Sequence, residues 1–174
     1  MMDPLSAKRY FTALNWILLY KPEFRNLLQH RLRKPPRTVA SIMQYFACRL
    51  LWKPKSDLEL SCDDIGGGLF IQHGYGTSVC AKRIGENCWI NQLVAVGFNG
   101  LGYPVIEDNV TLCCRTSVFG DLTMHENSIA GAHALVLKDV PRNAIVAGNP
   151  AKVLRIRTEE EVEKAKEQGV PIAN

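Results

Sequence analysis

A six-residue repeat of aliphatic side chains constrains this chain more than any other feature of its sequence. The repeat occupies three stretches: Ile65 and Ile71; Ile84, Ile90 and Val96; and Ile106, Leu112, Val118, Met124, Ala130 and Val136. An α-helix repeats its apolar positions near every 3.6 residues and a half-buried strand every 2, so neither explains a sustained period of six. A coil with three flat sides, each one hexapeptide long, does explain it.

Residues that suit tight corners fall between the repeated positions. They are Gly66, Gly85, Asn87, Asn109, Gly120, Asn127 and Gly131. Glycine and asparagine tolerate the left-handed backbone that such corners use. Stacked coils pair their backbones along the axis and bury one continuous apolar column.

One segment breaks the repeat. Between Val96 and Ile106 the sequence reads GFNGLGYPV, with three glycines and a proline. We therefore predict a loop that leaves the coil here, and such loops commonly carry functional residues.

Short helices are predicted on both sides of the coil, over residues 5–19, 22–34 and 37–52 before it. Pro22 suits a helix start. After the coil, Thr158 and Glu161 form a capping box for a helix that ends at Gly169. The chain thus divides into an N-terminal helical segment (1–56), a coil domain (57–155) and a C-terminal helix with a tail (156–174).

Charge is distributed unevenly along the chain. Residues 1–55 carry eleven Lys and Arg against two acidic residues, and residues 56–174 carry ten against fifteen. A basic region can face nucleic acid or an anionic membrane. The aromatic side chains here lie at helical spacings that indicate packing, so we expect no nucleic-acid partner. A solvated basic face is the simpler interpretation, and peripheral membrane contact is the alternative.

Cysteine usage and hydropathy narrow the location. The six cysteines form no C-x-x-C pair, and the N-terminus does not resemble a signal peptide, so we expect a reduced cytoplasmic protein. The longest apolar run, residues 39–52, is too short and too polar to cross a bilayer.

The stretch IGGGLFIQHGYG, residues 65–76, contains one histidine, His73, among apolar residues and glycines. Taken alone, the stretch leaves two interpretations open. His73 is either a structural histidine with satisfied hydrogen bonds or a general base that faces a substrate cleft.

Two segments and the repeats together resemble one known family. IGGGLFIQHGYG and DVPRNAIVAGNPAKVLR (residues 139–155) are similar to motifs of the hexapeptide-repeat acyltransferases, in the serine acetyltransferase branch. The resemblance covers residues 59–155. The segment LLYKPEFRNLLQHRL (residues 18–32) resembles short members of that branch, which are often found in surface-polysaccharide pathways.

The resemblance implies a fold and an assembly. The fold is mainly β: a left-handed parallel β-helix of hexapeptide repeats, with short N-terminal α-helices and a C-terminal helix. The assembly is a homotrimer in which acetyl-CoA, the co-substrate, lies in a groove between neighbouring subunits. Hexapeptide coils also host zinc in γ-class carbonic anhydrases, which need three converging histidines. Because His73 and His125 are more than fifty residues apart and no third histidine is close, we expect no metal.

The resemblance also assigns catalytic and donor-binding residues. His73 matches the histidine that deprotonates the acceptor hydroxyl, and Glu59 is the nearest equivalent of the acid that orients it. A hydroxyl barely ionises at neutral pH, so it needs such a base to attack a thioester. The pantetheine groove uses main-chain groups at Gly131-Ala132 and, in place of another glycine-alanine pair, at Cys113-Cys114, so Cys114 is assigned to this groove. Lys152 matches the residue that faces the nucleotide phosphates, and Arg155 assists it.

The acceptor side departs from the branch. Gln72 stands where serine acetyltransferases carry an acid that holds the serine ammonium group. Gly102-Tyr103-Pro104 replaces an Arg-His-Pro run that supports the serine carboxylate. Asn99 and Tyr103 suit hydrogen bonding and stacking with a sugar.

The prediction is therefore an acetyl-CoA-dependent O-acetyltransferase that acts on a small-molecule hydroxyl, with a sugar or polysaccharide precursor as the first choice of acceptor. The alternative is an L-serine O-acetyltransferase of cysteine biosynthesis. The second alternative is a non-catalytic β-helix scaffold.

Overall fold

The structure is a computed structural model that describes residues 4–33 and 38–169. The chain forms two compact units, Met1–Ser56 and Asp57–Asn174. The first unit contains three helices, α1 (Pro4–Tyr20), α2 (Pro22–Leu32) and α3 (Val39–Leu51), close to the predicted ranges. Pro22 lies in the first turn of α2, as predicted.

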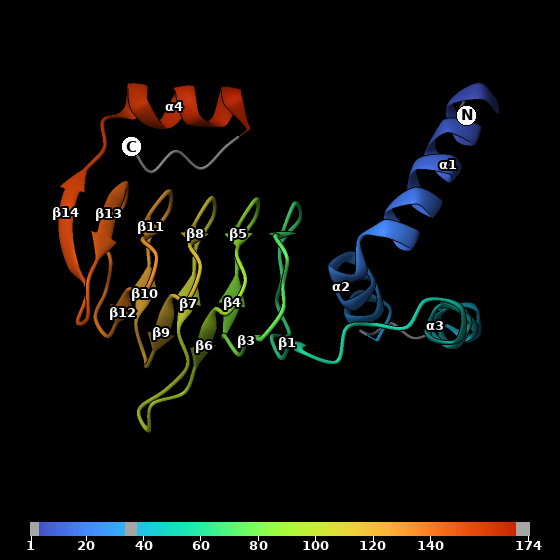
Figure 1. The fold of residues 1–174 in the computed structure, drawn as a ribbon, viewed down its shortest axis with the longest axis horizontal. Helices are drawn as coiled ribbons and strands as arrows, with labels where there is room; N and C mark the ends of the chain where they lie inside the picture. Colours follow the sequence, from blue (N-terminus) through green and yellow to red (C-terminus); the bar gives the residue numbers. More distant parts are fainter. Residues whose placement is uncertain (1–3, 34–37, 170–174) are drawn as a thin grey trace. The chain divides into compact units, whose positions relative to one another are not determined.

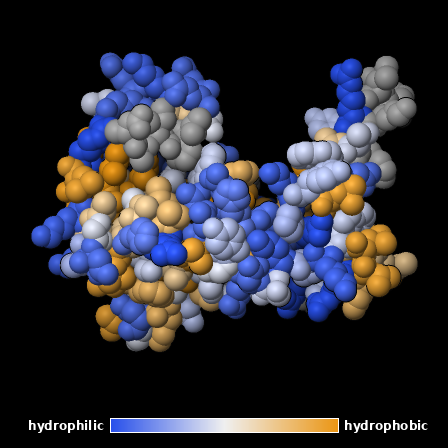
Figure 2. All heavy atoms as spheres, viewed as in Figure 1, coloured by the Kyte–Doolittle hydropathy of each residue, from blue (hydrophilic) through white to orange (hydrophobic). Residues whose placement is uncertain are grey.

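Within the first unit, α2 is held by hydrogen bonds to the segment that follows α3. Gln29 Nε2 donates to the carbonyl oxygen of Trp52 at 3.0 Å. Asn26 makes two bonds with the backbone of Lys55, one through its Nδ2 at 2.9 Å and one through its Oδ1 at 2.8 Å. In contrast, α3 buries none of its residues, and Figure 2 shows apolar side chains at the surface over this helix. No helix in the described ranges has the length and hydropathy needed to cross a membrane.

The second unit is a coil of short strands arranged in three parallel sheets (Figure 1). The five-stranded sheet contains β1 (Leu58–Leu60), β3 (Thr77–Val79), β6 (Ala95–Gly97), β9 (Ser117–Phe119) and β12 (Leu135–Val136). The three-stranded sheet contains β4 (Arg83–Ile84), β7 (Val105–Ile106) and β10 (Thr123–Met124). The six-stranded sheet contains β2 (Phe70–Ile71), β5 (Trp89–Ile90), β8 (Thr111–Leu112), β11 (Ile129–Ala130), β13 (Ala144–Ala147) and the antiparallel β14 (Lys152–Ile156). The predicted fold class, a left-handed parallel β-helix with flanking helices, is confirmed.

The six-residue repeat forms the core of this coil. All eleven repeated positions are buried, from Ile71 at 9% exposed to seven positions at 0%. Each repeated side chain points inward from its strand and stacks on its counterparts in neighbouring coils, as the register of Ile71, Ile90 and Leu112 shows. The predicted apolar column is therefore confirmed.

The predicted corner residues meet two different requirements, a left-handed backbone or a small side chain. Asn87, Asn109, Asn127 and Gly120 have positive φ, as expected. Gly66 and Gly85 are needed for a different reason, because a Cβ on either would lie 2.6 Å from the backbone of the next coil. Gly131, the remaining predicted corner, is likewise absent from the residues with positive φ. Among the described residues other than glycine, positive φ also occurs at His73, Leu93, Arg115, His133 and Asn143, which were not among the predicted corners.

We expect Asn127→Ala to lower the free energy of unfolding by about 2–3 kcal/mol, from a strained left-handed corner and a lost hydrogen bond. Asn127 has φ 58°, is 1% exposed, and its Nδ2 donates to Asn143 Oδ1 at 2.9 Å. Urea unfolding of the purified protein measures the change. Asn127→Gly keeps the backbone freedom and loses only the bond, so it should cost about 1 kcal/mol. Equal losses in the two variants would contradict the role of the left-handed backbone.

The C-terminal helix α4 (Glu159–Gln168) follows β14 and forms as predicted. Thr158 Oγ1 accepts from the backbone N–H of Glu161, and Glu161 accepts from the N–H of Thr158, which completes the capping box. Gly169 ends the helix with φ +62°. The helix buries Val162 and Ala165 and lies along the six-stranded sheet (Figure 1).

Candidate active site

The corner between the six-stranded and five-stranded sheets carries half of the predicted site residues. Four turns stack there, residues 72–76, 91–94, 113–116 and 131–134, each between a strand of one sheet and a strand of the other. Backbone hydrogen bonds of 3.0 to 3.1 Å connect each turn to the next. We call these four turns the His73 edge.

His73 lies in the first of these turns, directly after β2. Its φ is +65° and its side chain is exposed, outside the apolar column. Gly74 and Gly76 also have positive φ, and a Cβ on Gly76 would lie 2.7 Å from Leu93 Cδ2. The tight turn is therefore built from residues that allow it, and it leaves His73 exposed outside the apolar column.

The predicted pantetheine-binding residues lie on the same edge. Cys113 and Cys114 begin the third turn, and Gly131 and Ala132 begin the fourth. A Cβ on Gly131 would lie 3.2 Å from the carbonyl oxygen of Val146, so this turn approaches the next coil closely. Burial, and then the neighbouring Cys114, raise the pKa of the Cys113 thiol. This thiol stays protonated near neutral pH and is therefore a poor competitor for an acyl group.

The two predicted phosphate-binding residues are placed differently. Lys152 is the first residue of β14 and lies opposite Ala147, the last residue of β13. The turn between these two strands lies at the end of the coil, next to the His73 edge. Its side chain is exposed and makes no ion pair within the described residues. Arg155 lies opposite Ile145, further along β14, and its Nη1 is 2.7 Å from Glu161 Oε1 of α4. The structure thus brings Lys152 towards the His73 edge and ties Arg155 to the C-terminal helix.

Glu59 lies on β1, in the five-stranded sheet, in register with Ser78 of β3. The hydroxyl of Ser61 donates to its Oε1 at 3.0 Å, and the hydroxyl of Ser78 donates to its Oε2 at 3.2 Å. The carboxylate is therefore held on the outer face of this sheet. Its strand, β1, pairs with β3, which is the strand that follows His73 in the chain.

Gln72 is half-buried beside His73 and belongs to a small polar cluster that the sequence did not reveal. The indole Nε1 of Trp89 donates to Asn91 Oδ1 at 2.9 Å and to Gln72 Oε1 at 3.2 Å. These contacts hold the carboxamide of Gln72 against the indole of Trp89. The available signal was that Trp89 directly precedes the inward-pointing Ile90, on the strand that pairs with β2.

Asn99 and Tyr103 lie on a different edge. Their loop, residues 98–104, connects β6 of the five-stranded sheet to β7 of the three-stranded sheet (Figure 1). The rings of Phe98 and Tyr103 lie 5.2 Å apart, and Asn99 Oδ1 accepts from the backbone N–H of Leu101 at 3.1 Å. A single chain therefore does not bring the predicted sugar-binding residues to His73.

No His, Cys, Asp or Glu side chains of residues 4–33 and 38–169 gather in a group of three that could hold a metal ion. His125, the second histidine considered for zinc, has its Nδ1 3.3 Å from Glu107 Oε2.

Curated relatives of the chain are serine acetyltransferases. A putative serine acetyltransferase of Schizosaccharomyces pombe is 37% identical over 93 residues, which is 51% of this chain and 34% of that protein. A serine acetyltransferase of Staphylococcus epidermidis is 31% identical over 136 residues, 75% of this chain and 62% of that protein. No family model matches. The chain covers from 27% to 62% of the length of such relatives.

Solved structures that resemble this chain are also serine acetyltransferases. The serine acetyltransferase of Brucella abortus in complex with coenzyme A aligns with a TM-score of 0.61 and 26% identity, over 80% of this chain and 58% of that one. A soybean serine acetyltransferase complexed with serine aligns with a TM-score of 0.61 and 25% identity, over 79% and 59%.

Proposed function

We infer that this chain, a hexapeptide-repeat protein of the serine acetyltransferase-like branch, is an O-acetyltransferase that takes acetyl from acetyl-CoA. One observation carries the proposal: the exposed imidazole of His73 lies on the same edge as the turns at 113–116 and 131–134. A base and the main-chain groups of two turns therefore follow one line along the coil.

The proposed reaction uses His73 as general base. The imidazole accepts the proton of the acceptor hydroxyl while the oxygen attacks the thioester carbonyl. The resulting imidazolium then returns the proton to the departing thiolate, which leaves as free CoA. Backbone N–H groups at the turns supply the means to stabilise the oxyanion. Glu59, held by two serine hydroxyls, is proposed as a positioning residue for His73.

The spacing of the strands supports the donor assignment. Neighbouring strands lie about 4.8 Å apart, so the four steps from β2 to β13 span about 19 Å. Lys152 begins β14 at the far end of this line. An extended pantetheine chain suits this span. We place its thioester beside His73 and a phosphate near the Lys152 ammonium group. Between these ends the chain would pass Cys114, Gly131 and Ala132. Arg155, paired with Glu161, contributes less to this contact.

L-serine is the acceptor that we propose first, although the sequence pointed first to a sugar. The relatives described above are named serine acetyltransferases, and one neighbouring structure contains serine. In this chain the neutral Gln72 would meet the serine by hydrogen bonds. A sugar hydroxyl is the second candidate, favoured by the exposed aromatic pair of Phe98 and Tyr103 and by Asn99.

A homotrimer is part of the same proposal. The loop with Asn99 and Tyr103 lies on another edge than His73, so it can meet the imidazole only if it comes from a second copy of the chain. The exposed apolar side chains of α3 suit contact with a second copy or with a membrane surface.

All six cysteines are free thiols, which supports a cytoplasmic location.

The proposed activity predicts release of CoA from acetyl-CoA in the presence of L-serine, measured as free thiol. We expect faster release with L-serine than with amino sugars or simple glycosides. Acetyl-CoA at 100 times its Kd should also add about 2.7 kcal/mol to stability.

Faster release with a glycoside would move the proposal to the second candidate. A protein with no turnover on any acceptor and no thermal shift with acetyl-CoA would be the non-catalytic scaffold instead.

A further inference from the structure

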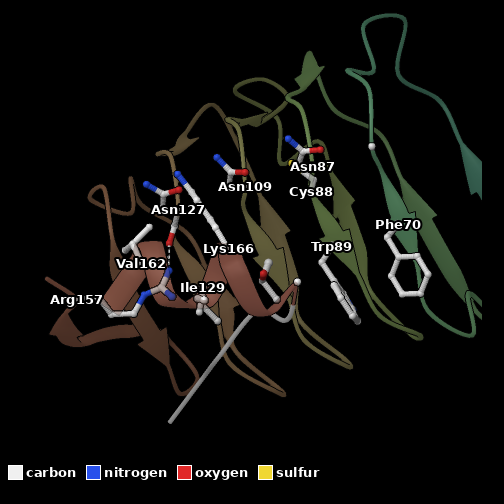
Figure 3. Close-up of a pocket in the computed structure, with 14 residues that line it drawn as sticks. Phe70, Asn87, Cys88, Trp89, Asn109, Asn127, Ile129, Arg157, Val162 and Lys166 are labelled. Carbon is white, nitrogen blue, oxygen red and sulfur yellow. Dashed lines mark hydrogen bonds between the residues drawn. The ribbon is translucent and has the colours of Figure 1, made fainter. Parts of the chain in front are cut away.

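A cavity of about 680 Å³ lies between the outer face of the six-stranded sheet and α4 (Figure 3). Its floor is one ladder of outward-facing residues in register: Phe70, Trp89, Thr111 and Ile129. Val162 and Ala165 of α4 form the opposite wall. The volume is in the range of sites for small organic molecules.

One end of the cavity is aromatic. The rings of Phe70 and Trp89 lie 4.5 Å apart at an interplanar angle of 64°. The indole is fixed by its hydrogen bonds to Gln72 and Asn91. Phe70 remains 45% exposed, which is unusual for a large ring in an apolar ladder and leaves this end open to a ligand.

The other end is cationic. Arg157 is only 7% exposed, and Figure 3 shows its guanidinium directed into the space between Ile129 and Val162. Its Nη2 donates to the carbonyl oxygen of Asn127, and its Nε has no hydrogen-bond partner within the described residues. Lys166 also lines the cavity, and no acidic residue does so.

The nearest acids are already engaged. Glu161 pairs with Arg155 and accepts from the N–H of Thr158, and Glu159 Oε1 accepts from Asn143 Nδ2 at 2.9 Å. Burial, and then the neighbouring Arg155, lower the pKa of Arg157. A buried guanidinium with an unused N–H and no paired carboxylate is costly, and an anion at that position would relieve the cost.

The two ends define the shape of a ligand. Arg157 contacts the coil of Ile129, and the step from Ile129 to Trp89 crosses two strand spacings, about 10 Å. We propose that this cavity binds a small amphipathic carboxylate, with its carboxylate on Arg157 and its apolar body against Trp89 and Phe70. A free inorganic anion would leave the aromatic end unfilled, and a neutral hydrocarbon would leave Arg157 unpaired.

Isothermal titration calorimetry on the full chain, without acetyl-CoA, tests this site with 2-naphthoate as the probe. We expect one molecule bound per chain, and at least tenfold weaker binding for 2-naphthamide, which lacks the charge, and for acetate, which lacks the body. Arg157→Gln should weaken 2-naphthoate binding at least tenfold. Arg83→Gln, an exposed arginine on the three-stranded sheet, should leave it unchanged.

Two further measurements keep the outcome clear. Thr111→Phe fills the floor of the cavity without removing the arginine and should also abolish binding, which covers the case in which Arg157→Gln does not fold. Saturating acetyl-CoA should not displace the probe. Absence of binding, equal binding of 2-naphthamide, or displacement by acetyl-CoA would each overturn the proposal, and none of these results depends on whether the His73 edge is catalytic.

Discussion

Replacement of His73 by asparagine is expected to lower the rate of acetyl transfer by about 10²–10⁴-fold, the usual contribution of a general base. The imidazole of His73 is an exposed base in the first turn of the edge that carries the proposed donor groove, and asparagine cannot take up the hydroxyl proton. Asparagine is the informative choice because His73 has φ +65°. Alanine at this backbone conformation would add strain and confuse a loss of activity with a loss of structure.

The measurement is CoA release at saturating acetyl-CoA, together with the thermal shift that acetyl-CoA produces. The shift should survive in the variant because donor binding is assigned to main-chain groups and Lys152. His125→Asn is the matched control, since that half-exposed histidine interacts with Glu107 outside the His73 edge. Equal losses in the two variants, or a His73→Asn protein that keeps its rate, would remove His73 from the reaction.

The second large effect concerns the apolar column. Leu112→Ala should lower the free energy of unfolding by about 2–5 kcal/mol, because a cavity opens in a close-packed core. Leu112 is 0% exposed on β8, with β5 on one side and β11 on the other, so the lost contacts belong to both neighbouring coils.

Urea unfolding at fixed protein concentration measures this loss, since any oligomer would make stability depend on concentration. Leu137→Ala is the matched control, because that leucine is 48% exposed and its truncation should change stability by about 0.5 kcal/mol or less. A comparable loss in both variants would contradict the assignment of the six-residue repeat to the core.

The core could be predicted from the sequence because each hexapeptide contributes one inward side chain. Ile84, Ile106 and Met124, for example, are spaced far apart in the chain and yet form one buried stack. The capping box at Thr158 was equally predictable, since both of its partners lie within a single helical turn.

The site was only partly predictable for a geometric reason. Repeat counting indicates which side chains point inward, but it does not indicate on which of three edges a given turn falls. The loop with Asn99 and Tyr103 was therefore grouped with His73, although it follows a strand of a different sheet. Similarly, Arg155 was assigned to phosphate before its partner Glu161, on a helix that follows the coil, could be placed.

The cavity under α4 left no periodic signal. Phe70, Trp89 and Ile129 face outward from their strands, where packing does not constrain residue type in a repeating pattern. Their alignment depends on the register of four coils, and the burial of Arg157 depends on how α4 returns over the sheet. Long-range features of this kind appear only when the coils are stacked.

Because whole coils stack, distances along the His73 edge come in units of one coil. The distance along the edge from His73 to Lys152 changes only when the chain gains or loses a complete coil, by about 4.8 Å each time. Substitutions within a turn can widen or narrow the path along the edge, but they cannot adjust its length continuously. Under the proposed function, such a chain would take donors of one length, while substitutions within the turns could still change the acceptor.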